Sequence, residues 1–284
     1  MFKSILLAVD ASHYSEVCTR YALEYAQGLR VDLRVLSVLD RKEFALVYPY
    51  YYPTADFPPV FDETVFESSE LYEKQKRRAE EVLQRIERDC RSLHIAFHCD
   101  IREGIVSDVI LEEVKNIDLL FMGLKGSGAE FSSGWLGSNL ANVVRRSRLP
   151  VIVTPKIYRP LQKILVCFDG SECAVKALRA ASHLTASCPG KNIGLRLLVV
   201  QDLEEAAHQI AEKAIKYLES GQPDEIFLHR KGEIAKTIVE TAQAEDADLV
   251  VMGAYGHSRV REILLGSTTE RVLRTVNRAL LLHH

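Results

Sequence analysis

The stretch "VVMGAYGHSRVREILLGSTTERVL", from Val250 to Leu273, joins an apolar run, a glycine-containing turn and an amphipathic helical pattern. A looser copy, "LLFMGLKGSGAEFSSGWLGSNLANVV", occupies residues 119–144. Short aliphatic runs that alternate with helical patterns are typical of parallel sheets covered by helices on both faces. The two copies therefore predict two similar α/β units in one chain.

The rest of the chain repeats in the same way. "KSILLAVDASHYSEVCTRYALEYA" at residue 3 matches "QKILVCFDGSECAVKALRAASHLT" at residue 162, and "LRVLSVLD" at 33 matches "LRLLVVQD" at 195. Each half is predicted to run β-α-β-α-β-α-β-α-β. The halves, residues 1–157 and 158–284, meet at a connector bracketed by Pro155 and Pro160. The sequence thus predicts two tandem, doubly wound, open parallel sheets of five strands each.

Composition limits the function classes. The 284 residues are 47% hydrophobic and 26% charged, with a net charge of −3, so no basic field indicates nucleic acid or an anionic membrane. The sequence has no run of about 18 apolar residues and no signal-peptide pattern, so we expect a cytoplasmic protein. The six cysteines contain no C-x-x-C pair, and no metal-ligand set is predicted.

The polar residues of both halves fall where a ligand site is expected. Ligands of open α/β sheets bind at the carboxyl ends of the strands, where the strand order reverses. Asp10 and Asp169 end the first strand of each half, and the glycines end the fourth. Glycine lets a phosphate approach backbone N–H groups, and "STTE" from Ser267 is predicted to be a capping box with Ser267 as the N-cap. The alternative is that these glycines only form a turn and a tight helix start.

The combined pattern resembles the universal stress protein family, in which a G-x2-G-x9-G-[ST] motif after strand four binds the phosphates of ATP. Gly253, Gly256, Gly266 and Ser267 match this motif with its spacing. The resemblance implies a Rossmann-like fold of the adenine-nucleotide α-hydrolase type, with Asp169 at the ribose and Val200 near the adenine. It implies ATP as ligand, with ADP or AMP as alternatives and Mg²⁺ as a companion ion. The implied site comprises Cys167, Phe168, Asp169, Val200, Met252, Gly253, Gly256, His257, Gly266, Ser267, Thr268 and Thr269.

The N-terminal half departs from the motif. Ten residues separate Gly126 from Gly137 where the motif has nine, and the residues after Ser138 lack the two threonines. We therefore expect a weaker nucleotide site there, which comprises Asp10, Val38, Gly123, Gly126, Gly137 and Ser138.

A second difference is an insertion rich in tyrosine and proline, at about residues 41–66 of the N-terminal half. Its aromatics indicate packing against something: the cleft, the other half or another chain. The last strands of the two halves are expected to pair with each other, which would make an internal pseudo-dimer. A homodimer would then need another surface.

Three functions stay open at this point. The first is a nucleotide-binding signalling protein that uses ATP as a conformational ligand, with slow hydrolysis at most. No catalytic residue is predicted, because the motif holds no evident general base and no P-loop lysine. The second is an adenylate-forming or ATP-hydrolysing enzyme of the same superfamily. The third is a scaffold that binds a protein partner through the insertion.

Overall fold

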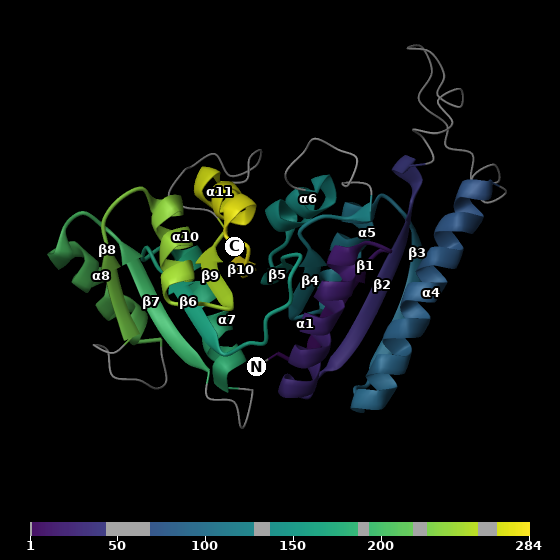
Figure 1. Cartoon of the computed structure of the whole chain (residues 1–284), viewed down its shortest axis with the longest axis horizontal. Helices are drawn as coiled ribbons and strands as arrows, with labels where there is room; N and C mark the ends of the chain where they lie inside the picture. The colour runs from purple at the N-terminus through teal and green to yellow at the C-terminus, as the bar shows by residue number, and fades with distance from the viewer. Residues whose placement is uncertain (1, 44–68, 128–136, 187–192, 218–225, 255–265) are drawn as a thin grey trace, which may run out of the picture.

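The chain folds into two βα repeats that share one sheet (Figure 1). The structure is a computed structural model that describes residues 2–43, 69–127, 137–186, 193–217, 226–254 and 266–284. The N-terminal half contains β1 (Ser4–Val9), α1 (His13–Leu29), β2 (Asp32–Asp40), α4 (Glu70–Leu93), β3 (Phe97–Gly104), α5 (Val106–Glu113), the 3-10 helix η2 (Val114–Asn116), β4 (Leu119–Gly123), α6 (Ser138–Arg146) and β5 (Val151–Thr154). The C-terminal half contains β6 (Lys163–Cys167), α7 (Glu172–Ala186), β7 (Gly194–Val200), α8 (Glu204–Ile215), β8 (Phe227–Arg230), α10 (Ile234–Ala244), β9 (Leu249–Gly253), α11 (Ser267–Thr275) and β10 (Ala279–His283).

The sheet has ten strands in the order β3-β2-β1-β4-β5-β10-β9-β6-β7-β8. Within each half all pairs are parallel, and the strand order reverses between β1 and β4 and between β6 and β9. The fold class predicted from the sequence is confirmed: each half is an open, doubly wound, parallel five-stranded sheet. The reversal defines where each half can bind a ligand.

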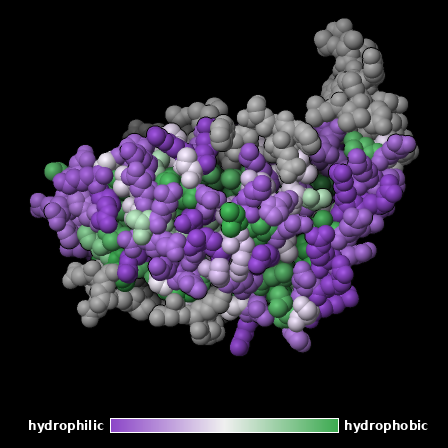
Figure 2. Space-filling model, in the orientation of Figure 1, coloured by the Kyte–Doolittle hydropathy of each residue, from purple (hydrophilic) through white to green (hydrophobic). Residues whose placement is uncertain are grey.

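Helices cover both faces of this sheet. Ile5 and Leu7 of β1 join a cluster formed with α1, α4, α7 and α8, whereas Leu6 joins a second cluster formed with α5, α6, α10 and α11. Successive side chains of a strand point to opposite faces, so an unbroken apolar strand supplies both clusters. The outer surface of α4 is hydrophilic, as Figure 2 shows. No described helix combines the length and the apolar character needed to cross a bilayer.

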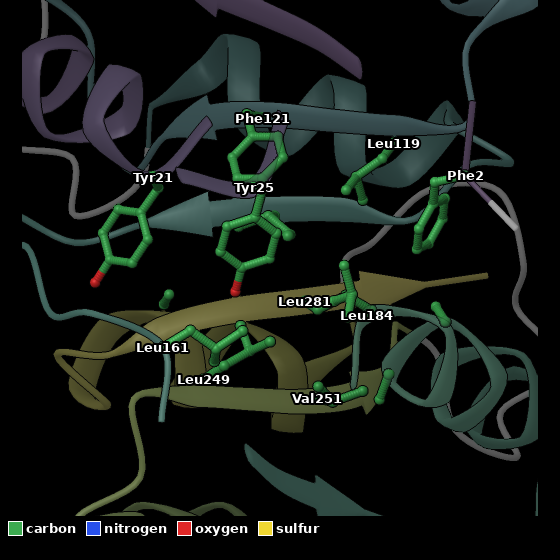
Figure 3. Close-up of a cluster of buried hydrophobic side chains, with 14 of the residues drawn as sticks. Phe2, Tyr21, Tyr25, Leu119, Phe121, Leu161, Leu184, Leu249, Val251 and Leu281 are labelled. Carbon is green, nitrogen blue, oxygen red and sulfur yellow. The ribbon is translucent and has the colours of Figure 1, made fainter. Parts of the chain in front are cut away.

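The two halves join through their last strands. β5 and β10 are antiparallel, with Ile152 opposite Leu281, and this confirms the predicted pairing within one chain. One apolar cluster continues across the seam: Tyr25 of α1 packs edge-on against Phe121 of β4 at 5.3 Å between ring centroids, and Leu281 of β10 faces them (Figure 3). Because the core is shared, neither half presents this edge of its sheet to solvent.

The connector between the halves is bound on both sides. The Tyr158 hydroxyl donates to Glu24 of α1 at 2.9 Å, and the Arg159 N–H donates to the Tyr21 hydroxyl at 2.9 Å. The Arg159 guanidinium donates through Nε to the buried carboxylate of Asp248, just before β9, at 3.0 Å. The connector therefore ties the first helix of one half to the fourth strand of the other.

Most of the Tyr/Pro-rich insertion lies outside the described residues. Residues 41–43 continue from β2 as helix, and α4 begins at Glu70 with Ser69 as its N-cap. The Ser69 hydroxyl accepts the Tyr72 N–H at 3.1 Å, which sets the start of the helix. The proposed packing of the insertion stays a prediction.

Candidate functional site

The predicted N-terminal residues meet at one cavity of about 550 Å³. It lies at the carboxyl ends of β1, β2 and β4, beside the reversal in strand order. All six residues predicted for this half line it: Asp10, Val38, Gly123, Gly126, Gly137 and Ser138. A cavity of this volume is within the range of small-molecule sites.

Asp10 is held in place by its neighbours. Its Oδ1 accepts the Ser15 hydroxyl at 2.7 Å and the Ser12 N–H at 2.9 Å. Its Oδ2 accepts the Ser127 N–H at 2.7 Å, from the glycine-containing loop after β4. Both carboxylate oxygens are therefore engaged, and a ribose would compete with the loop for Oδ2.

The glycines have different structural roles. A Cβ at Gly253 would lie 2.9 Å from the Ala174 backbone N and 2.9 Å from the Cys173 Cβ, so this glycine admits the start of α7. A Cβ at Gly126 would lie 2.6 Å from the Asp10 Oδ2, so this glycine allows the loop to reach the carboxylate. Close packing within the chain explains both glycines without a ligand.

Gly266 differs from these two. The nearest described atom to a Cβ at Gly266 would be the Ala254 carbonyl oxygen at 3.7 Å, which is an ordinary contact. Packing among the described residues therefore does not require a glycine at this position, whereas close approach of a ligand would.

The predicted capping box is wrong. Gly266, not Ser267, is the N-cap of α11, and no side chain caps the helix among the described residues. The Glu270 N–H donates to the Gly266 carbonyl at 2.9 Å, which makes Ser267 the first helical residue. The Thr269 hydroxyl donates to the buried Ala254 carbonyl at 2.7 Å and so ties α11 to the end of β9. Ser267 is exposed, and the first turn keeps N–H groups without intrahelical acceptors.

The aspartate of the C-terminal half is less engaged than Asp10. Asp169 follows β6, is exposed, and accepts the Ser171 N–H through Oδ1 at 2.9 Å. Within the described part of the chain its Oδ2 has no hydrogen-bond partner. Gly256 and His257, two further predicted residues, lie outside the described residues.

Five further predicted residues have apolar side chains. Met252 and Cys167 are buried on one face of the sheet, and Phe168 is buried on the other. Val200, the last residue of β7, is partly exposed, as is Val38 of β2.

Sequence reasoning missed the charged residues of the N-terminal cavity. Lys42, Arg78 and Lys125 line it together with Asp40 and Glu43. Burial raises the pKa of Asp40, opposed by the hydrogen bond from the Lys42 N–H at 2.9 Å. Lys125 could have been found from the sequence, because it stands between two of the predicted glycines in "GLKG". Arg78 could not, because it comes from α4, beyond the insertion.

The fold and the site define a tandem α/β protein whose halves each carry an aspartate and a glycine-capped helix where the strand order reverses. The chain belongs to the universal stress protein family, whose model matches residues 1–155 and 160–283.

Two relatives match nearly the full length of the chain. The universal stress protein Slr1230 of Synechocystis sp. is 29% identical over 282 residues, which cover 96% of each chain. A universal stress protein of Mycolicibacterium smegmatis is 22% identical over 289 residues, covering 94% of this chain and 92% of the relative. The crystal structure of a universal stress protein from Archaeoglobus fulgidus shares the fold, with a TM-score of 0.71 and 21% identity over 99% of this chain and 97% of that one. The tandem arrangement is thus found in other proteins of this family.

Proposed function

We propose that this universal stress protein is a signalling protein that binds ATP at the carboxyl ends of β6, β7 and β9, in the unit formed by residues 158–284. One observation carries the proposal. The exposed carboxylate of Asp169 follows β6, and the first turn of α11, which no described side chain caps, belongs to the segment that follows β9. β6 and β9 are neighbouring strands at the point where the strand order reverses. Carboxylate and unbonded N–H groups are the partners that a ribose and a phosphate chain need.

The ribose and the base are assigned to three residues. Asp169 accepts the ribose hydroxyls, and its unpartnered Oδ2 does so without breaking a bond within the described chain. Val200 provides the apolar contact to the adenine, and the buried Met252 belongs to the apolar cluster against which Val200 packs. Cys167 and Phe168 contribute their backbone, because both side chains are buried.

The phosphates are assigned to the loop and the helix start after β9. Gly256 and Gly266 let the phosphates come close, and Ser267 and Thr268 supply hydroxyls and N–H groups at the positive end of the α11 dipole. His257 belongs to the same loop in the sequence. Thr269 contributes its N–H, since its hydroxyl already binds Ala254. Mg²⁺ would accompany the phosphates through the hydroxyl oxygens.

The nucleotide serves mainly as a conformational ligand, with slow hydrolysis at most. Burial raises the pKa of the Cys167 thiol above its ordinary range, so this thiol stays protonated at neutral pH and is a poor nucleophile. Rapid turnover of ATP by the purified protein would instead favour an adenylate-forming or ATP-hydrolysing enzyme.

The unit formed by residues 1–157 is proposed to bind nucleotide more weakly. Its cavity has the needed volume, but the Asp10 Oδ2 must release the Ser127 N–H before it can accept a ribose hydroxyl. We also propose a cytoplasmic location, in keeping with the reduced thiols of the buried Cys18, Cys90 and Cys167.

A matched pair of glycine variants tests the assignment. Gly137 and Gly266 are the N-caps of α6 and α11, and a Cβ at either would lie at least 3.6 Å from described atoms. Gly266→Val should lower ATP affinity by at least about tenfold, because the side chain occupies the space of a phosphate. Gly137→Val should change it by less than about twofold, because the weaker site contributes little. Isothermal titration calorimetry measures both, with circular dichroism to verify the fold.

The outcome distinguishes the sites. Unchanged ATP affinity in a folded Gly266→Val protein would show that the α11 start is not the phosphate site. A larger loss in Gly137→Val would transfer the principal site to the N-terminal half. Mass spectrometry of nucleotide released from the purified protein would separate ATP from ADP and AMP.

A further inference from the structure

A second cavity, of about 290 Å³, lies at the seam between the halves. We call it the seam cavity. The carboxyl ends of β4 and β5 contribute Lys125 and Lys156, and the end of α11 and the turn into β10 contribute Arg274 and Arg278. Because β5 and β10 are antiparallel, the carboxyl end of β5 meets the amino end of β10 at this place. The site is complete only when both halves are present.

The lining carries charge of one sign. Of the described residues that line the seam cavity, four are cationic and none is Asp or Glu. Arg274 pairs with Glu270 along its own helix, and Arg278 Nη2 lies 3.7 Å from the Asp246 carboxylate. Neither Lys125 nor Lys156 has an ion-pair partner in the described part of the chain. The two unpaired ammonium groups leave an uncompensated positive field in the cavity.

The Arg278 guanidinium also has a hydrogen-bond donor without an acceptor among the described residues. Its side chain is 15% exposed, and its Nη1 donates to the Asn277 carbonyl at 3.2 Å. Its Nε is buried without a partner among the described residues. A planar guanidinium with unused donors suits recognition of an oxyanion better than a lone ammonium does.

The repeat does not explain these cations. Strand register aligns Thr154 with His283, so Lys125 corresponds to Tyr255 and Arg278 corresponds to Leu149. The residue that corresponds to Pro155 is His284, whose Nε2 lies 3.0 Å from the Val144 carbonyl oxygen. Lys125 and Arg278 therefore have no cationic counterpart in the other half. If these cations served only to pack the repeat, both halves would be expected to carry them.

We propose that the seam cavity binds a polyphosphate group. Several cations come from different elements, and no described residue brings a carboxylate to the lining, which matches the charge of a multivalent phosphate chain. A volume of about 290 Å³ exceeds the roughly 30 Å³ that one water occupies. Leu124 and Lys125 line both this cavity and the N-terminal cavity. The polyphosphate is therefore either a free inorganic chain or the phosphate tail of a nucleotide whose base lies in the N-terminal cavity.

Lysine substitutions test the proposal in the full chain. Lys156 is exposed, so Lys156→Gln removes charge without disturbing the core, and Lys115→Gln removes an equal charge from an exposed residue that does not line the cavity. Calorimetric titration at low salt with sodium tripolyphosphate should show saturable binding to the unaltered protein. Lys156→Gln should weaken it about tenfold, and Lys115→Gln should leave it unchanged.

ATP identifies the source of the phosphate chain. If tripolyphosphate does not bind but Lys156→Gln weakens ATP binding relative to Lys115→Gln, the occupant is the tail of a nucleotide. If neither titration differs between the two variants, the seam cavity is not a polyphosphate site and the proposal is wrong.

Discussion

Gly253 and Gly266 belong to the same predicted motif, yet the structure predicts that alanine destabilises the protein at Gly253 and has almost no effect on its stability at Gly266. A Cβ at Gly253 would lie 2.9–3.0 Å from backbone and Cβ atoms of Cys173 and Ala174. The start of α7 must move by about 0.5 Å to regain an ordinary contact of 3.4 Å, against a packed core. We expect Gly253→Ala to lower the free energy of unfolding by roughly 2 kcal/mol, and the melting temperature by about 4–8 °C.

Gly266→Ala should leave stability almost unchanged. The new Cβ meets described atoms no closer than 3.7 Å, and the N-cap angles of φ −53° and ψ 138° are open to alanine. Alanine is a poorer N-cap than glycine, but it also restricts the unfolded chain, and these effects of up to about 1 kcal/mol oppose each other. We expect a net change within about 0.5 kcal/mol.

Thermal unfolding followed by circular dichroism measures the contrast. Gly123→Ala serves as a control, because a Cβ at Gly123 would lie 2.9 Å from the Tyr14 Cβ in the N-terminal half, and it should be destabilised like Gly253→Ala. Equal melting temperatures for the Gly253 and Gly266 variants would refute the reasoning that separates a packing glycine from a ligand glycine.

Two further predictions concern the connector and the end of β10. Arg159→Gln should lower the free energy of unfolding, measured in urea, by about 1–2 kcal/mol, because it leaves the buried Asp248 carboxylate without its cation. The effect stays moderate since the Arg159 side chain is 31% exposed. Arg88→Gln, at an exposed site, is the control, and an equal loss in both variants would contradict the prediction. Burial, with Lys176 adding to it, lowers the pKa of His283 from 6.5 to about 4, so the unfolded chain binds a proton that the folded protein does not. Stability should therefore decrease by about 2–3 kcal/mol as the pH falls from about 6.5 to about 4, and His283→Asn should flatten this part of the profile; identical profiles would argue against the shift.

Much of the fold followed from the sequence because its signals are local. Apolar runs of strand length, helical periodicity between them and a repeat over the whole chain predicted the order of elements in both halves. The reversal in strand order places Asp10 beside the loop that holds Gly126, so the six residues predicted for the N-terminal site could be expected to meet, and they line one cavity.

The helix start after β9 shows where local signals fail. "STTE" fits a capping box, but the N-cap is the residue whose backbone leaves the helical region, and this residue is Gly266. The Thr269 hydroxyl donates to the Ala254 carbonyl and so takes no part in capping the helix. Which residue caps the helix depended on the distance between the end of β9 and the start of α11, and only the tertiary structure sets this distance.

The sequence by itself determined that there are two βα repeats, that each carries an aspartate and glycines at the ends of its first and fourth strands, and that the C-terminal motif is the intact one. Only the tertiary structure decided which hydrogen bonds and close contacts those residues make. It closed the loop after β4 onto Asp10, placed the start of α7 against Gly253, and brought Lys125 and Arg278 from different halves to one cavity. Strand and helix periodicity depend on neighbours along the chain, whereas close approach and electrostatic fields depend on distances between segments that are far apart in the sequence.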